Sequence, residues 1–216
     1  MTAAGGAVRV GRLTAAELPG AAPGLGAVLA DAVEDGASVG FLAPLDAVRA
    51  AAWWSGLGPD LASGALALWC AREGERIVGT VQLRCETAAN GSHRGEIAKL
   101  IVHRDARGRG LARRLLGTAE EHARAAGRRL LLLDTQTGSA AERLYRSTGW
   151  TPLGTVPGYA ADPSGALRPT TFFHKDLGAG GGGAGGARPP RGGPRPGRGG
   201  GAPPPGGARP PADRRH

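Results

Sequence analysis

Residues 107–112 have the residue types and the spacing to bind a phosphate group. They read Arg-Gly-Arg-Gly-Leu-Ala, follow an apolar strand-like run and open a run with helical periodicity. Amides at a helix start have no intrahelical acceptor, and the helix dipole adds to their attraction for an anion. Gly108 and Gly110 permit the unusual backbone angles of a close cradle, and the arginine side chains of this region can pair with further phosphate charge. Taken alone, the segment fits a phosphate site and a plain connection equally well.

Two better-known nucleotide loops do not fit this segment. The P-loop requires GxxxxGK[ST], and the chain contains no Gly-Lys pair. A dinucleotide-binding turn requires GxGxxG after the first strand of a parallel sheet. Here the turn follows the fourth predicted strand, and Arg113 stands where the third glycine would be.

Hydrophobic periodicity places the segment inside a mixed α/β domain. The strand, helix, strand succession over 96–134 implies that its two strands pair in parallel. Thr14 and Glu17 have the spacing of a capping box, which starts a helix. We predict strands over 7–13, 65–72, 76–86, 96–102, 130–133, 150–156 and 170–175, and helices over 25–35, 45–57, 111–126 and 139–147.

The charge and glycine content divide the chain into two parts. Its 216 residues include 39 glycines and carry a net charge of +9, a composition that favours a nucleic-acid partner at first sight. However, residues 179–216 hold six of those nine charges and contain no aromatic residue and no Val, Ile, Leu or Met. This tail is predicted to be disordered because nothing in it offsets the entropy of ordering. Residues 1–178 are then one domain, long enough to bury a core.

No segment approaches the roughly 18 to 20 consecutive apolar residues of a membrane helix, and the N-terminus lacks a signal-peptide pattern. We therefore expect a cytoplasmic protein without membrane contact. Cys70 and Cys85 fall too far apart on a predicted hairpin to form a disulfide. With no CxxC motif and five scattered histidines, the sequence predicts no metal site.

Two motifs carry a family resemblance. Residues 107–112 match [Q/R]xxGx[G/A] at each specified position, and residues 141–150 match A-x-x-L-Y-x-x-x-G-[F/W]. These are the acyl-CoA signature and a second common signature of the GNAT superfamily of N-acetyltransferases, here in the right order and elements. The chain therefore resembles this superfamily. The resemblance implies an α/β GNAT fold, with a mixed central sheet of six to seven strands, splayed between strands 4 and 5 and flanked by about four helices.

A narrower likeness runs over about 8–177. The tabtoxin-resistance acetyltransferases and their relatives have similar segments to those at 36–41, 98–102, 106–111, 133–135, 138–139 and 157–159. This likeness implies acetyl-CoA as co-substrate, no metal, and a small-molecule primary amine as acceptor, such as a tabtoxin-like β-lactam or an amino-acid-like toxin. A protein or peptide amine is the alternative acceptor.

The resemblance also implies catalytic roles. An alkylamine with a pKa of about 10 must lose a proton before it attacks the thioester. Glu96 and Asp134, near the expected gap between the splayed strands, are the candidate general bases, and Tyr145 is the candidate donor of a proton to the departing sulfur of a tetrahedral intermediate. The alternative roles are a solvated strand end for Glu96, a cap for Asp134 and a core aromatic for Tyr145.

Cofactor contacts are expected from backbone as much as from side chains. The backbone of strand 4 would pair with the pantetheine arm as an added strand, and one amide could polarise the acetyl carbonyl. Gly138 stands where many relatives carry an Asn, so Ser139 is the expected substitute. The predicted cofactor-binding residues are Leu100, Ile101, Val102, Arg107, Gly108, Arg109, Gly110, Leu111, Ala112 and Ser139.

Four aromatic residues, Phe41, Trp53, Trp54 and Tyr159, are candidates either for the acceptor pocket or for core packing. A function of another class, RNA binding or scaffolding, would depend on the tail, whose residues 191–193 and 198–200 read Arg-Gly-Gly. The tail has no aromatic residue on which bases could stack, so nucleic-acid binding is not favoured. The acceptor amine, the length of the acyl group, the general base and the oligomeric state are left open.

Overall fold

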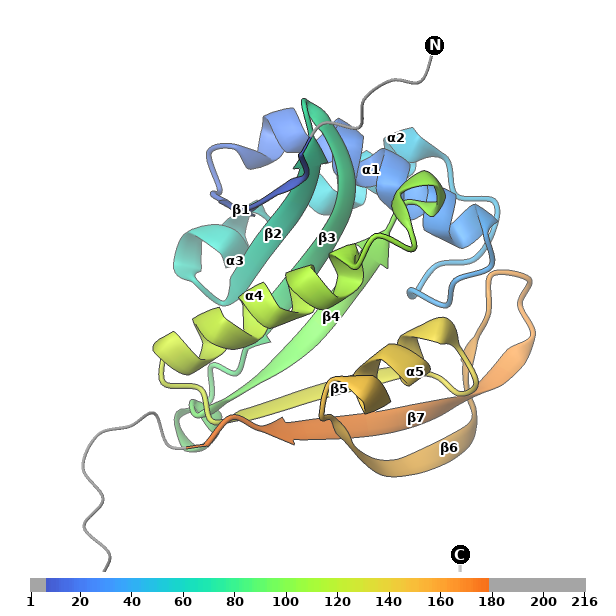
Figure 1. Cartoon of the computed structure of the whole chain (residues 1–216). Helices are drawn as coiled ribbons and strands as arrows, with labels where there is room; N and C mark the ends of the chain where they lie inside the picture. Colours follow the sequence, from blue (N-terminus) through green and yellow to red (C-terminus); the bar gives the residue numbers. More distant parts are fainter. Residues whose placement is uncertain (1–6, 179–216) are drawn as a thin grey trace, which may run out of the picture. The chain divides into compact units, whose positions relative to one another are not determined.

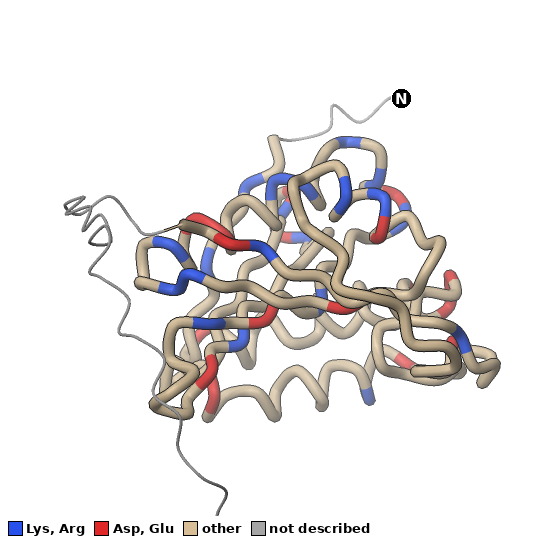
Figure 2. Tube along the Cα trace, turned by 90° about the horizontal axis from the view of Figure 1, so that it is seen from below, with Lys and Arg blue, Asp and Glu red and all other residues tan. Residues whose placement is uncertain are grey.

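A computed structural model describes residues 7–178 (Figure 1). The predicted disorder of 179–216, and with it the proposed division into a domain and a tail, lies outside these residues. Within 7–178, no helix is both long enough and apolar enough to cross a bilayer. Basic and acidic residues are intermixed along the trace in the view of Figure 2.

The centre of the fold is a seven-stranded sheet with the order β1-β2-β3-β4-β5-β7-β6. Each neighbouring pair is antiparallel except β4 and β5, which are parallel as predicted. The mixed GNAT sheet of six to seven strands is therefore confirmed. The strands are β1 (Arg9–Leu13), β2 (Leu66–Glu73), β3 (Arg76–Cys85), β4 (Arg94–Val102), β5 (Leu130–Gln136), β6 (Thr151–Ala161) and β7 (Leu167–Asp176).

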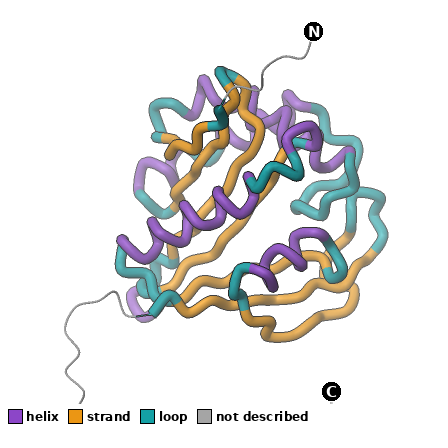
Figure 3. The backbone as a smooth tube through the Cα atoms, viewed as in Figure 1, coloured by secondary structure: helices purple, strands orange, loops and turns teal. Residues whose placement is uncertain are grey.

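Helices cover the two faces of this sheet unequally (Figures 1 and 3). On one face, α4 packs over β2 to β4 and α5 over β5, while α1 packs on the opposite face of β3 and β4 and α2 packs against α1. The α-helices are α1 (Leu18–Glu34), α2 (Ala47–Ser55), α3 (Gly58–Ser63), α4 (Leu111–Ala125) and α5 (Ala140–Ser147).

Alternation along the strands sorts side chains between two cores. In β3, Val81 and Leu83 belong to the core beneath α4 and α5. Leu68 of β2 and Ile101 of β4 belong to the core beneath α1 and α2. The intervening β3 side chains, among them Gln82, therefore lie on the α1 and α2 side of the sheet.

The largest differences from the sequence prediction lie in three elements. α1 begins at Leu18, well before residue 25, because Thr14 and Glu17 form the predicted capping box and Pro23 is accommodated inside the helix. α3 was not predicted, since six residues are too few to show a period. β6 continues past 156 through an irregular register.

The two cysteines lie on neighbouring strands without pairing. Cys70 is buried and Cys85 is half-buried, and both are free thiols. The register sets Thr80, not Cys85, opposite Cys70.

Candidate active site

The parallel strands β4 and β5 pair over only three positions and then diverge (Figure 1). The last paired position joins Glu96 to Leu132. Beyond it, the second half of β4 has no strand partner on its β5 side within the described residues. This opening, which we call the β4–β5 gap, contains the backbone of Leu100, Ile101 and Val102 that was predicted to bind pantetheine.

A β-bulge lies in β4 where the gap opens. Gln82 of β3 pairs with Ala98, but Thr80 pairs with Ile101, so two residues of β4 stand opposite one of β3. The first of these two, Lys99, has a φ of 48°. A bulge of this kind bends the strand and redirects its side chains, and here it coincides with the point where β4 leaves β5.

Glu96 and Asp134 both point to the α1 and α2 side of the sheet, across the β4–β5 gap. Glu96 shares a face with its cross-strand partner Arg84, and Asp134 alternates with Leu133, which belongs to the opposite core. Both carboxylates are exposed. Partial burial nevertheless raises the pKa of Asp134 above its ordinary value, and the positive charge of Lys99 opposes that rise. Asp134 thus ionises less readily than an ordinary aspartate and lies within electrostatic range of Lys99.

Tyr145 approaches the gap from the other side. Its ring is 6 % exposed and packs against Trp150 and Phe173, with ring centres 5.9 and 6.1 Å away. Burial raises the pKa of the Tyr145 hydroxyl, and the charge of Asp134 raises it further. The hydroxyl forms no hydrogen bond with residues 7–178. Tyr145 is therefore protonated at neutral pH and has a proton to donate.

The predicted phosphate loop lines a hollow of about 200 Å³ at the start of α4. Gly108 and Gly110 have φ values of 74° and 73°, the left-handed region that glycine adopts at least cost. The first helical bond runs from the amide of Arg114 to the carbonyl of Gly110 at 3.1 Å, and the Arg107 amide donates to the Arg104 carbonyl at 3.3 Å. The amides of residues 108–113 have no backbone acceptor in the described chain, and all of these residues except Arg109 line the hollow. The hollow is lined by Val102, Ala106, Arg107, Gly108, Gly110, Leu111, Ala112, Arg113 and Leu144.

The arginine side chains of this loop were expected to be free to bind phosphate, but in the structure they contact other residues of the domain. Arg107 pairs with Asp35 at 2.5 Å and donates to the Val102 carbonyl at 3.1 Å, and Arg109 pairs with Glu73 at 3.0 Å. Further along, the next two arginines donate to Ser147 and to the Val8 carbonyl. These side chains fasten the loop to the rest of the domain, so the backbone amides are its free donors.

Ser139 has a structural task that the sequence reasoning missed. Its hydroxyl accepts a hydrogen bond from the amide of Glu142 at 3.1 Å and so caps α5. The Glu142 carboxylate in turn accepts from the Gly138 amide at 2.5 Å. The Ser-x-x-Glu spacing could have shown this capping box. The Ser139 hydroxyl is therefore already bonded at the position where a pantetheine contact was predicted.

The four aromatic candidates separate into core and surface. Trp54 is 0 % exposed and belongs to the core beneath α1 and α2. Phe41 and Trp53 are half-buried and meet edge to face with ring centres 5.3 Å apart. Tyr159 is 53 % exposed and packs on Phe172 of β7. Phe41, Trp53 and Tyr159 thus remain available to an acceptor, whereas Trp54 serves packing.

The profile of the acetyltransferase (GNAT) family matches residues 40–150 of this chain, which is just over half of it and contains both motifs. The chain belongs to the GNAT family. The observed fold agrees with that of solved GNAT structures. The ribosomal-protein-alanine N-acetyltransferase of Brucella melitensis is 25 % identical, with a TM-score of 0.62 over 78 % of this chain and 99 % of its own.

Two further similar proteins extend this comparison. The structure of yncA from Salmonella typhimurium, solved with its cofactor acetyl-CoA, is 19 % identical, with a TM-score of 0.62 over 86 % of this chain and 99 % of its own. An IAA acetyltransferase of Azospirillum brasilense is 37 % identical over 94 residues. That match covers 43 % of this chain and only 60 % of the relative's length.

Proposed function

We propose that this GNAT protein transfers an acetyl group from acetyl-CoA to the primary amine of a small molecule. One observation carries the proposal. At the β4–β5 gap, the buried and protonated Tyr145 lies close enough to Asp134 for the carboxylate charge to raise the pKa of the tyrosine hydroxyl. Family membership and a structural neighbour solved with acetyl-CoA support the choice of donor.

Acetyl-CoA would lie along β4 with its phosphates at the start of α4. The unpaired second half of β4 fits the pantetheine arm, which can hydrogen-bond to an open strand edge as an added strand does. The amides of the 107–112 loop fit the pyrophosphate. Leu144 lines the same hollow as those residues, and Tyr145 is the next residue of α5, which would place the thioester near the tyrosine.

In the reaction, a carboxylate accepts a proton from the acceptor ammonium, directly or through water. The neutral amine then attacks the thioester carbon, and a C–N bond forms. As the tetrahedral intermediate collapses, the C–S bond breaks and the Tyr145 hydroxyl gives its proton to the departing sulfur. The former amine nitrogen loses its remaining extra proton, which water relays to the tyrosinate, so that an amide is left and Tyr145 is again protonated. The carboxylate then releases to solvent the proton it took.

Asp134 is the preferred general base and Glu96 the alternative. The raised pKa of Asp134 makes it a stronger proton acceptor than an ordinary aspartate, and Asp134 is the carboxylate that influences Tyr145. Glu96 stands at the last paired position of β4, opposite Arg84. It would then orient the ammonium rather than take its proton.

The proposal is tested by measuring amine-dependent thiol release from acetyl-CoA over a panel of acceptors. The panel includes tabtoxinine-β-lactam and amino acids, because the likeness to tabtoxin-resistance acetyltransferases predicts them. It also includes a peptide beginning with alanine, since one similar structure is a ribosomal-protein-alanine N-acetyltransferase. Thiol release with the small amines alone supports the proposal. Thiol release with the peptide alone would mean that the acceptor is a protein or peptide amine.

The tail-dependent alternative, RNA binding, is separated by deleting residues 179–216. Acetyl transfer should survive the deletion at the rate of the full chain. Salt-sensitive binding of RNA that disappears with the tail, in a chain with no transferase activity, would favour the alternative.

A further inference from the structure

The side chain of Lys99 ends in an aromatic corner beside the two carboxylates. Its ammonium lies 5.7 Å from the ring centre of Phe41 and 5.3 Å from that of Trp53. A carbon added at Gly40 would stand 3.5 Å from the same nitrogen. The ammonium of Lys99, which comes from β4, therefore lies among apolar groups of α2 and of the loop after α1.

This ammonium has no ion pair and no hydrogen bond with residues 7–178, although it carries three donors. The other lysine of the described chain differs sharply, because Lys175 bonds to Glu120 at 2.6 Å and to the Thr148 carbonyl at 2.8 Å. A partly desolvated charge without a partner is costly unless a ligand supplies one. Lys99 thus has no negatively charged partner among the described residues, and a ligand could supply one.

The backbone of Lys99 also carries strain. Its φ of 48° is uncommon for a residue with a side chain. Such strain is kept where the surrounding fold requires a side chain at that place. Here the side chain of the bulge residue extends toward Phe41 and Trp53, on the α1 and α2 side of the sheet.

The charges around the gap are arranged to receive a zwitterion. Burial and the nearby charge of Arg84 lower the pKa of Lys99, while Asp134 and Glu96 oppose that effect. Positive and negative groups therefore stand near each other without forming an ion pair. A ligand with an amine and a carboxylate has charges complementary to these groups, because its amine can face Asp134 while its carboxylate faces Lys99.

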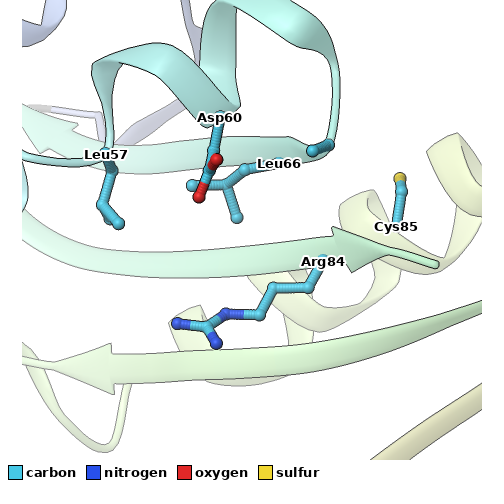
Figure 4. Close-up of a pocket in the computed structure, with 6 residues that line it drawn as sticks. Leu57, Asp60, Leu66, Arg84 and Cys85 are labelled. Atoms are coloured by element: carbon cyan, nitrogen blue, oxygen red, sulfur yellow. The ribbon is translucent and has the colours of Figure 1, made fainter. Parts of the chain in front are cut away.

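Arg84 adds a second positive charge on the same face. It lines a hollow of about 230 Å³ together with Leu57, Asp60, Ala65, Leu66 and Cys85. Figure 4 shows its side chain extending along the sheet, away from Cys85. Arg84 is exposed and pairs with no carboxylate in the described chain, so it strengthens the attraction for an anion at the mouth of the site.

Unsatisfied polar atoms beneath the bulge point to a bound ligand or ordered water. Gln82 and Thr80 are each 0 % exposed and stand opposite Ala98 and Ile101, the residues that flank the bulge. Neither amide atom of Gln82 nor the Thr80 hydroxyl has a hydrogen-bond partner among residues 7–178. Buried polar groups are nearly always bonded, so atoms from outside the chain are expected beside them.

We propose that Lys99 binds the carboxylate of the acceptor, and hence that the acceptor is a small amine that carries its own carboxylate, as an amino acid does. The inference rests on the proposed function, since it names the acceptor class of that reaction. Lys99 acts as a specificity residue: it touches the acceptor at a distance from the reacting nitrogen and takes no part in proton transfer.

The test uses the full chain and matched amine pairs. Acetyl transfer is measured with L-phenylalanine against phenethylamine and with L-leucine against isoamylamine, so that each pair differs in the carboxylate alone. We expect kcat/KM to be at least tenfold higher for the amino acid of each pair. The Lys99→Met variant should raise the KM of the amino acid at least tenfold, leave the KM of acetyl-CoA unchanged and abolish the preference within each pair.

Two further variants make the result specific. Lys99→Arg should restore part of the preference, because guanidinium also pairs with carboxylates. Arg49→Met, which removes one positive charge from the exposed face of α2, should change neither constant. Equal loss of kcat for both members of a pair in Lys99→Met would overturn the proposal, because Lys99 would then act on Asp134 and not on the acceptor.

The outcomes separate this inference from the proposed function. Transfer to amines regardless of their carboxylate overturns the role of Lys99 and leaves the acetyltransferase proposal intact. If the chain binds acetyl-CoA but transfers to none of these amines while it acetylates a peptide, the small-molecule acceptor and the role of Lys99 are both wrong.

Discussion

The charge of Asp134 acts on Tyr145 across the β4–β5 gap, because the carboxylate adds to the effect of burial in raising the pKa of the tyrosine hydroxyl. The two residues come from different elements, the end of β5 and the buried side of α5. Their proximity places a proton acceptor and a proton donor at one opening. The following predictions test what each does there.

Removal of the Tyr145 hydroxyl should slow the reaction without disturbing the fold. Tyr145→Phe keeps the ring contacts with Trp150 and Phe173, so we expect kcat to fall about 100-fold, in the range of general acid catalysis. The KM of acetyl-CoA and the thermal midpoint should stay near their wild-type values. Steady-state kinetics and a melting curve check this, and an unchanged kcat would remove Tyr145 from the mechanism.

Asp134→Asn should lower activity and raise stability together. Because burial raises the folded pKa of Asp134, its charged form is disfavoured in the fold, and the carboxyl costs stability as pH rises through that pKa. The neutral amide escapes this cost, so the free energy of unfolding at pH 7 should increase while kcat falls. Urea unfolding and kinetics on the same preparation give both values.

The matched comparison for Asp134 is Glu96→Gln. If Asp134 is the base, Glu96→Gln should lose less activity than Asp134→Asn. The wild-type kcat/KM should rise with pH through the raised pKa of Asp134, and that rise should disappear in Asp134→Asn. The reverse ranking of the two variants would assign the base to Glu96.

Gly110→Ala should weaken the binding of acetyl-CoA. Its φ of 73° is strained for a residue with a side chain, at a cost of about 1 kcal/mol, and relief of that strain would turn the amide cradle away. We expect the KM of acetyl-CoA to rise about tenfold, which corresponds to about 1.4 kcal/mol. Gly117→Ala in the middle of α4 is the control, since it should stabilise the helix by about 0.5–1 kcal/mol and leave the KM unchanged.

The second motif is held in place by a largely buried ion pair. Lys175 pairs with Glu120 at 2.6 Å, and the same carboxylate accepts from the Trp150 indole at 2.9 Å. Lys175→Met leaves that carboxylate without its cation and should lower the free energy of unfolding by about 3 kcal/mol. Chemical denaturation measures the loss, and a change below about 1 kcal/mol, the worth of a surface pair, would show that the pair is solvated.

Much of this architecture could be predicted from sequence because strands and long helices have periodic patterns. The parallel pair β4 and β5 followed from the helix between them, and the tight turn before α4 from its glycines, Gly108 and Gly110. α1 was placed too late because Pro23 and its glycines hide the period that the buried residues of the helix actually follow.

The site could be predicted less completely than the fold. The special position of Lys99 was not predicted because it depends on a β-bulge. A bulge arises from the register of two paired strands, which the sequence of one strand does not reveal. The pairing of Arg107 with Asp35 joins residues far apart in the chain, so nothing local indicated that the loop arginines were already bonded. Ser139 was assigned to the cofactor, although its spacing to Glu142 indicates a cap.

The central claim is that the chain moves an acetyl group from acetyl-CoA to an amine. The most direct measurement incubates the full chain with acetyl-CoA and the amine panel and quantifies free thiol and N-acetylated product together. The account predicts one acetylated amine for each thiol released, with the rate reduced about 100-fold in Tyr145→Phe. Thiol release that does not depend on any amine would contradict the claim, whereas transfer that is equally fast in Tyr145→Phe would leave it standing and remove Tyr145 from the mechanism.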